Sequence, residues 1–363
     1  MRILQVCSAE TIGGGERHVA DLMRVLVERG HEVHCAVRPA SQLPSSLGDL
    51  PIHWYHIGLR NALDLLSIRR LRKIIAEQNI EIVHAHLARD YPMVGLATKA
   101  TSARFFLTRH HFNPIKSNPL YEASINHVTN LIAVSGAVQN ALSKAFPHLR
   151  ERIRVIPNWL DSRTLQRVNR ADAREHLGIQ AFWAIAIIGQ LTPLKRQDFF
   201  LEAVSRLTAN SAYERADFFI IGEANKADQT YAEKLKRLVQ EMRLNGRVHF
   251  LGQVHDLPKY LTAFDIVVAP SENEGFSLAT IEAMAAGCAV IAADVGGLSE
   301  IIEPDQTGVL FSPNNVEMLV QRMSELLFDS SKRNLLGQAA QATALDRYDR
   351  GKVVAQIEEL YKN

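Results

Sequence analysis

Residues 266–292, IVVAPSENEGFSLATIEAMAAGCAVIA, decide the fold. The apolar run 266–269 predicts a buried strand, and 278–286 predicts a helix that Gly287 ends. A second apolar run at 289–292 predicts another strand. Strands that alternate with helices form a parallel sheet covered by helices on both faces, so this stretch is typical of an α/β protein.

The same alternation extends over the whole chain. It predicts two Rossmann-like, doubly wound α/β lobes that face a central cleft. The other predicted strands are 3–6, 32–37, 82–85, 104–108, 131–134, 153–156, 183–188, 217–221, 248–251 and 308–310; helices are predicted at 16–29, 63–78, 93–101, 137–145 and 352–361. A turn-like break at 157–161 precedes the polar residues 162–174, and we place the boundary between lobes 1–162 and 163–346 there.

Composition limits the class of protein. The length of 363 residues suits two domains, and no apolar run approaches the ~18 residues of a membrane span. Three scattered cysteines form no CxxC pair, which favours a reducing cytoplasm. The first 162 residues hold 19 Lys or Arg and 13 Asp or Glu, and the remainder hold 22 and 26. This basic first half suits an anionic partner such as a membrane surface, although scattered surface charge explains it equally well.

The loop and helix at 271–287 carry two carboxylates, Glu274 before the helix and Glu282 in its second turn. The flexible Gly275 lets free backbone N–H groups at the helix start approach an anion or a sugar oxygen. Each carboxylate can accept two hydrogen bonds, which suits adjacent hydroxyls of a sugar and a ribose. In the alternative reading, Glu282 faces solvent and Glu274 caps the helix.

The segment EGFSLATIEAMAAGCAVIAADVGGLSEII closely resembles the donor-site signature of the GT4 family of retaining glycosyltransferases, which have the GT-B fold. The resemblance extends over nearly the whole chain. It implies that Glu274 contacts the donor sugar and Glu282 the ribose hydroxyls. It also implies that the terminal helix, 347–363, crosses back to the first lobe. The remaining donor-binding residues of this segment are Gly275, Phe276, Ser277 and Leu278.

Gly13-Gly14-Gly15 lies at the first strand-to-helix turn and is followed by Glu16, Arg17 and His18. As a dinucleotide fingerprint it lacks the third glycine. It resembles the GGxER loop that similar glycosyltransferases place beside the donor diphosphate, where glycine allows close backbone approach and the helix offers its positive end. A purely structural tight turn is the alternative.

The turn after strand 183–188 contains Gly189, Gln190, Lys195 and Arg196. Family members commonly carry an arginine just after this glycine and a lysine a few residues later, and both neutralise the departing diphosphate. Here Gln190 stands at the arginine position and supplies no charge, whereas Lys195 is kept. Arg196 is a candidate substitute. Gly252 belongs to the strand and turn that resemble those approaching the nucleotide base.

Histidines follow two strands of the first lobe. His84 and His86 are expected to alternate across their strand, and no Cys or Glu completes a zinc set, so no metal site is predicted. Residues 108–111 resemble the family's T-x-H loop, which places His110 near the sugar. There an imidazole can hydrogen-bond sugar hydroxyls or donate to a developing charge. A structural histidine is the competing reading.

Two further segments concern the hinge between the lobes and a possible contact with lipid. Residues 155–161 match the family's VIPNGVD hinge, with Trp159 where glycine is usual. Residues 68–75 form a basic amphipathic helix stretch that could rest on anionic lipid or simply pack on its sheet with the charges in water.

Together these features predict a retaining glycosyltransferase in the cytoplasm, with a peripheral membrane contact left open. Its expected catalytic residues are His110, Lys195 and Glu274. We expect a UDP- or GDP-linked sugar as donor, a cell-envelope glycan or lipid-linked sugar as acceptor, no cofactor or obligatory metal, and no nucleic acid. The alternatives are a nucleotide-sugar-binding protein that has lost activity, which Gln190 favours, a nucleotide-sugar epimerase and a two-domain dehydrogenase.

Overall fold

The chain forms two compact units in the computed structural model, which describes residues 1–61, 64–112, 118–160, 166 and 168–363. The first unit comprises Met1–Asn158 and Gly351–Asn363, and the second comprises Trp159–Arg350. The predicted boundary between residues 162 and 163 and the hinge residue Asp161 lie outside the described residues. Trp159, which stands at the usual glycine of that hinge, is buried in the second unit.

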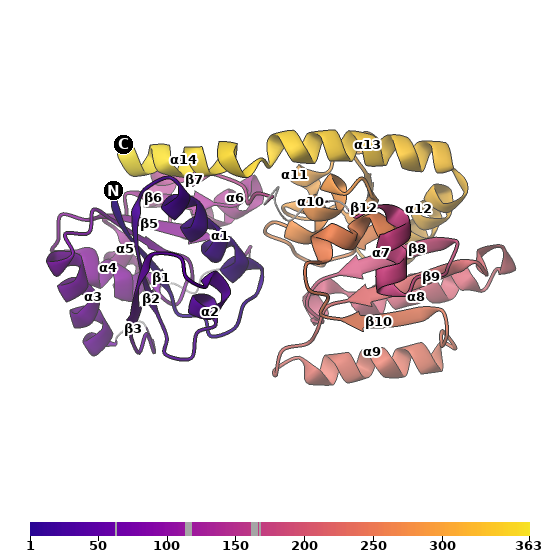
Figure 1. Cartoon of the computed structure of the whole chain (residues 1–363), viewed down its shortest axis with the longest axis horizontal. Coiled ribbons are helices and arrows are strands. Elements are labelled where there is room, and N and C mark those ends of the chain that lie inside the picture. The colour runs from indigo at the N-terminus through magenta and orange to yellow at the C-terminus, as the bar shows by residue number, and fades with distance from the viewer. Residues whose placement is uncertain (62–63, 113–117, 161–165, 167) are drawn as a thin grey trace. The chain divides into compact units, whose positions relative to one another are not determined.

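The first unit contains a seven-stranded parallel sheet in the order β3-β2-β1-β4-β5-β6-β7. Helices α1 and α2 lie on one side of this sheet and α3, α4 and α5 on the other (Figure 1). The strands are β1 Arg2–Cys7, β2 Glu32–Val37, β3 Ile52–His56, β4 Ile82–Ala85, β5 Arg104–Arg109, β6 Asn130–Ala133 and β7 Ile153–Val155. The helices are α1 Gly14–Glu28, α2 Leu43–Leu47, α3 Leu65–Glu77, α4 Tyr91–Thr98, α5 Pro119–Ile125, α6 Gly136–Ala145, η1 Pro147–Arg152 and α14 Arg350–Lys362.

The second unit contains a six-stranded parallel sheet in the order β10-β9-β8-β11-β12-β13. Its strands are β8 Trp183–Ile188, β9 Ala216–Ile221, β10 Val248–Gly252, β11 Ile266–Ala269, β12 Ala289–Ala293 and β13 Val309–Phe311. Its helices are α7 Arg170–Leu177, η3 Pro193–Lys195, α8 Gln197–Thr208, η4 Ser211–Tyr213, α9 Gln229–Glu241, η5 Leu257–Ala263, α10 Leu278–Ala285, α11 Leu298–Ile301, α12 Val316–Phe328 and α13 Ser330–Arg347.

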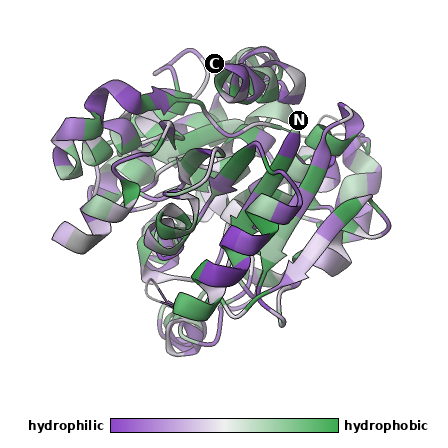
Figure 2. Cartoon of the chain, turned by 90° about the vertical axis from the view of Figure 1, so that its left-hand side faces the viewer, coloured by the Kyte–Doolittle hydropathy of each residue, from purple (hydrophilic) through white to green (hydrophobic). Residues whose placement is uncertain are grey.

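These two sheets confirm the predicted α/β class with two doubly wound lobes. The central strands are buried on both faces, as parallel strands between helical layers must be. Hydrophobic residues accordingly predominate along the strands, and hydrophilic residues collect on the outer helices (Figure 2). All three cysteines are buried and free. Among the described residues no helix combines the length and apolarity that crossing a membrane requires.

Helix α14 completes the first unit although it follows the second in the chain. The apolar side chains of Val353, Val354 and Ile357 are buried. Glu358 accepts hydrogen bonds from Arg29 and from His31, whose Nε2 lies 2.7 Å from the carboxylate. Burial alone would raise the pKa of Glu358, but the bonds from His31 and Arg29 hold it below its ordinary value. The ionic contacts therefore fix a specific register of α14 on this unit.

Candidate active site

The order of strands locates the functional end of each unit. In the first sheet the winding direction reverses between β1 and β4, and in the second it reverses between β8 and β11. Ligands of doubly wound folds bind beyond the carboxyl ends of the strands at this reversal. After β1, Gly13 precedes α1, and Gly14 and Gly15 begin that helix; the segments after β8 and β11 contain Lys195 and Glu274.

Lys195 and Glu274 meet in the second unit. The ammonium group of Lys195 forms an ion pair with Oε2 of Glu274, which also accepts a hydrogen bond from Ser271 Oγ at 3.3 Å. A backbone hydrogen bond of 2.9 Å from Glu272 N to Leu194 O ties the two loops together. Both charged side chains are mostly buried, with 28% of Lys195 and 14% of Glu274 exposed. A cation and a carboxylate are thus fixed side by side at the reversal point.

Glycines shape the turn after β8. Gly189 has φ +146°, and the aliphatic stem of Lys195 would lie 3.4 Å from a Cβ at this position. Gly222, which follows β9, has φ +132°, and a Cβ there would lie 2.1 Å from the carbonyl oxygen of Gly189. Since L side chains rarely adopt such φ values, both positions require glycine. Their close packing sets the path of the backbone that leads to Lys195.

Gly296 and Gly297 hold the loop that carries Glu274, and no site role was predicted for them. A Cβ on Gly296 would lie 2.3 Å from the carbonyl oxygen of Glu274, and one on Gly297 would lie 2.3 Å from that of Gly275. Gly297 N also donates to Glu274 O at 2.8 Å. The sequence feature that could have indicated this role is the Gly-Gly pair just after a predicted strand. Paired glycines are typical of places where two backbone segments approach closely.

The predicted helix start after this loop agrees closely with the structure. Helix α10 begins at Leu278, and the N-cap Ser277 accepts from Thr280 N at 3.3 Å. Ser277 rather than Glu274 therefore caps the helix. Glu282 is buried in the second turn, which excludes the alternative that it merely faces solvent. Phe276 packs edge-on against Tyr348 with ring centroids 5.5 Å apart, and its role is partly structural.

Three other predicted residues of the second unit make contacts of their own. Gln190 is exposed, and its carbonyl oxygen accepts from Gln197 Nε2 at 3.0 Å. Arg196 points to Asn314, with Nη1 2.6 Å from Oδ1, and stacks over Phe199. These contacts direct its guanidinium group away from Glu274. Gly252, with φ +64°, ends β10, and its carbonyl oxygen accepts from Gly222 N at 2.8 Å.

In the first unit the glycine turn is shorter than predicted. Helix α1 starts at Gly14 rather than at residue 16, with Gly13 as N-cap. Glu16 accepts from Gly13 N at 3.0 Å, as in a capping box, which explains how a glycine-rich segment can begin a helix. Gly14 and Gly15 thus belong to the first turn, where backbone N–H groups lack intrahelical acceptors. A Cβ on Gly15 would lie 3.7 Å from the His110 ring, so the structure brings these two predicted residues together.

The expected alternation of His84 and His86 is wrong. Their ring centroids are 4.2 Å apart, because residues two apart in a strand point to the same face. Both side chains are buried at the end of β4. Burial lowers the pKa of His84 to about 3, with repulsion from His110 as a further cause. Burial likewise lowers the pKa of His110 to about 3, helped by the neighbouring His111 and Arg109. Both imidazoles are neutral at pH 7.

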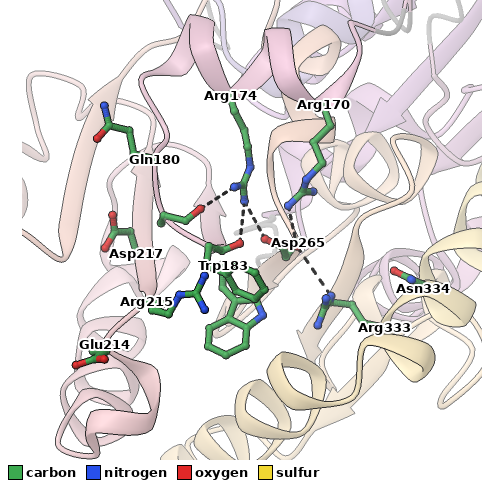
Figure 3. A pocket seen from close by; sticks show the side chains of 12 residues that line it. Arg170, Arg174, Gln180, Trp183, Glu214, Arg215, Asp217, Asp265, Arg333 and Asn334 are labelled. Atoms are coloured by element: carbon green, nitrogen blue, oxygen red, sulfur yellow. Dashed lines mark hydrogen bonds and ion pairs between the residues drawn. The ribbon is translucent and has the colours of Figure 1, made fainter.

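A hollow of about 900 Å³ lies elsewhere, at the amino ends of the strands of the second unit (Figure 3). There Arg170, Arg174 and Arg333 converge on Asp265, at 2.8, 3.1 and 4.0 Å. Arg174 also donates to the carbonyl oxygens of residues 181, 182 and 263. These arginines mainly join α7 and α13 to the sheet. We therefore place the candidate site at the carboxyl ends of the strands, not in this hollow.

Comparison with known proteins agrees with this geometry. The model of the family described as glycosyl transferases group 1 matches residues 169–343, and that of glycosyltransferase family 4 matches residues 12–163. N-acetyl-alpha-D-glucosaminyl L-malate synthase of Bacillus anthracis is 24% identical, over 97% of this chain and 94% of its own. Phosphatidyl-myo-inositol mannosyltransferase of Mycolicibacterium smegmatis is 28% identical, over 100% and 94%.

Solved structures show the same fold. HepE of Anabaena, in complex with UDP and glucose, superposes with a TM-score of 0.88 at 22% identity and covers 100% of both chains. A glycosyltransferase from Rickettsia africae superposes with a TM-score of 0.89 at 22% identity, over 99% of this chain and 97% of its own. With the two adjoining family matches, these findings show that the chain is a glycosyltransferase with the GT-B fold and belongs to the group 1 glycosyltransferases of family 4.

Proposed function

We propose that this enzyme transfers a glycosyl unit from a nucleotide-diphosphate sugar to an acceptor, with retention of the anomeric configuration. The observation that carries the proposal is the ion pair between Lys195 and Glu274 at the reversal between β8 and β11. It supplies one group for an anionic leaving phosphate and one for sugar hydroxyls. The second unit would bind the donor nucleotide and the first unit the acceptor.

In this proposal Lys195 stabilises the negative charge that grows on the diphosphate as the glycosidic C–O bond breaks. Pre-positioned cations act most strongly where charge develops in the transition state. Glu274 holds the lysine at the site and accepts from sugar hydroxyls. Glu282, buried in the second turn of α10, binds the ribose hydroxyls. The transition state resembles an oxocarbenium ion, as in other glycosyl chemistry, and attack occurs on the face from which the phosphate leaves.

The first unit contributes backbone N–H groups and an imidazole. The exposed start of α1 at Gly13–Gly15 offers its positive end to the diphosphate. His110, neutral at pH 7, hydrogen-bonds the sugar. We propose no metal for the transfer step, since Lys195 and these N–H groups supply the required positive potential.

We further propose a cell-envelope glycan or a lipid-linked sugar as the acceptor. Among the relatives, the mannosyltransferase of Mycolicibacterium smegmatis carries phosphatidyl-myo-inositol in its name, and another is a lipopolysaccharide core mannosyltransferase of Rhizobium meliloti. Helix α3 supports a membrane-bound acceptor. It exposes 63% of Leu65 and 69% of Leu66, beside exposed Arg69, Arg70 and Lys73. Apolar and basic side chains on one exposed surface suit peripheral contact with anionic lipid.

The test begins with nucleotides, since the acceptor is unknown. We expect one of UDP, GDP and ADP to bind in calorimetry and to raise the midpoint of thermal unfolding. The matching nucleotide sugars are then incubated with the enzyme in water alone. Proton NMR of the sugar that is first released reports its anomeric configuration. An α-linked donor should release the α-anomer; initial release of the β-anomer would contradict retention.

A matched pair of variants tests the site. Lys195→Met should weaken binding of the nucleoside diphosphate, whereas Arg196→Met, which changes a neighbouring cation that points away to Asn314, should leave it unchanged. If none of the three diphosphates binds, or if the two variants behave alike, the assigned donor site is wrong.

A further inference from the structure

Three histidines of the first unit direct ring nitrogens toward one another. His18 lies in α1, His86 follows β4, and His110 follows β5. One ligand-capable ring atom from each lies within 4.8 Å of the other two. The ring centroids of His18 and His110 are 4.7 Å apart, and His86 lies 6.2 and 6.0 Å from them. The three side chains come from distant parts of the sequence and converge at one end of the sheet.

The hydrogen bonds around this cluster separate His84 from its neighbour His86. His84 uses both nitrogens: Nδ1 lies 2.5 Å from Tyr361 Oη, and Nε2 lies 2.7 Å from Thr108 Oγ1. His86 bonds only through Nε2, 2.7 Å from Gln5 Oε1. Within the described residues, Nδ1 of His86 and both ring nitrogens of His110 are buried and have no hydrogen-bond partner. A buried polar atom without a hydrogen-bond partner destabilises the folded state, so such a cluster needs an explanation.

The outer contact of His86 suits metal ligation. Neutral imidazole is the form that binds metal ions. The Gln5 oxygen keeps the proton of His86 on Nε2 and leaves the Nδ1 lone pair for the cluster. Such an outer hydrogen bond is typical of metal-binding histidines.

We propose that His18, His86 and His110 bind one Zn²⁺ ion and leave its fourth coordination position for a water or a ligand oxygen. Tetrahedral zinc with bonds of ~2.0–2.1 Å places imidazole nitrogens ~3.4 Å apart, which modest ring rotations would reach. Three nitrogen ligands favour zinc and other late first-row ions over Mg²⁺ or Ca²⁺, which prefer oxygen. The position lies beside Gly15 at the start of α1.

A second histidine cluster in this unit serves as an internal comparison. Glu32, His34 and His53 also place ligand-capable atoms within 4.8 Å of one another. There, however, His34 bonds through both nitrogens, to Tyr55 Oη at 3.0 Å and to Glu32 at 3.1 Å. This second cluster is therefore a satisfied hydrogen-bond network, and we assign no metal to it.

The test uses the full chain after treatment with a chelator. Calorimetric titration with Zn²⁺ should give one site per chain, and Mg²⁺ should give none. His86→Ala should weaken zinc binding at least ~100-fold, and Gln5→Leu should weaken it ~10–100-fold by removing the outer hydrogen bond. His53→Ala is the matched control from the comparison cluster and should leave binding unchanged. Unfolding midpoints without metal show whether each variant folds.

A second measurement covers the case in which His86→Ala does not fold. Co²⁺ bound to the wild type should give the strong visible absorption of a tetrahedral site, and His18→Gln should abolish it. Absence of zinc binding by the wild type, binding lost with His53→Ala instead of His86→Ala, or an octahedral cobalt spectrum would each overturn the proposal. None of these readouts depends on transferase activity, so failure here is distinct from failure of the proposed function.

Discussion

Replacing Gly296 by alanine should slow the enzyme although Gly296 is not itself a proposed catalytic residue. The new Cβ would lie 2.3 Å from the carbonyl oxygen of Glu274, whereas a comfortable carbon–oxygen contact is about 3.3 Å. The loop that carries Glu274 must therefore move by roughly 1 Å. A displacement of this size at a catalytic group costs about 100-fold in rate. We expect kcat/KM for the donor to fall by about this factor.

The variant should also lose stability for two separable reasons. Gly296 has φ +48°, and an L side chain in this conformation costs about 1–2 kcal/mol. The clash with Glu274 adds about 1–3 kcal/mol, as overpacking typically does. Gly178→Ala is the matched control, since Gly178 has φ +68° and nothing lies within 4 Å of its Cβ position. Gly178→Ala should lose only the stability that an L side chain costs at positive φ, and it should keep wild-type activity.

The assay combines unfolding in urea with initial rates on the nucleotide sugar that the binding screen identifies. The difference in unfolding free energy between the two variants isolates the contact with the Glu274 loop. Equal stability and equal kcat/KM for Gly296→Ala and Gly178→Ala would refute the argument that Gly296 positions this loop.

Three further predictions follow from single contacts. Lys195→Ala should weaken binding of the nucleoside diphosphate about 10–100-fold in calorimetry, because one charge-assisted hydrogen bond is lost, with much less effect on the free nucleoside. Glu282→Ala should raise the donor KM strongly, and donors that lack ribose hydroxyls should no longer be discriminated; unchanged discrimination would exclude the ribose role. Burial raises the pKa of Asp90 from 3.8 to about 6, although Ser8 N donates to it at 3.0 Å. The folded state thus keeps a proton that the unfolded chain has lost, so this contribution to stability is complete below pH 4 and disappears as the pH rises through 6. The loss is about 3 kcal/mol, and Asp90→Asn should remove it from the pH profile of the unfolding midpoint.

The sequence predicted the central strands of both sheets best. The predicted bounds of β4, β8 and β11 coincide with those of the structure, because apolar runs of four to six residues between turn signals have few other interpretations. Strand β3, Ile52–His56, escaped notice since it is an edge strand with polar and half-buried positions. The long helix α13 was also not located, since its few apolar residues follow no marked helical period.

Site residues that share one segment of the sequence could be predicted, whereas contacts between distant segments could not. Glu274 and Glu282 lie in one segment whose spacing is diagnostic, so both were found. The contact between Gly296 and Glu274 joins residues of different loops, and only the folded backbone shows it. The grouping of His18 with His86 and His110 depends on three strand and helix ends meeting at one edge of a sheet. Of these three and His84, only His84 and His86 are close together in the sequence, and the prediction that they alternate across their strand is wrong.

The place of α14 in the first unit has a consequence for synthesis on the ribosome. The whole second unit, Trp159–Arg350, leaves the exit tunnel before the residues that complete the first. Domains fold as they emerge from the ribosome. The second unit should therefore reach its native state before the first unit, which must wait for α14. Until α14 is made, His84 and Arg104 lack the hydrogen bonds that they form with Tyr361 in the folded protein. Removal of the residues after 350 should therefore destabilise the first unit and leave the second unit intact.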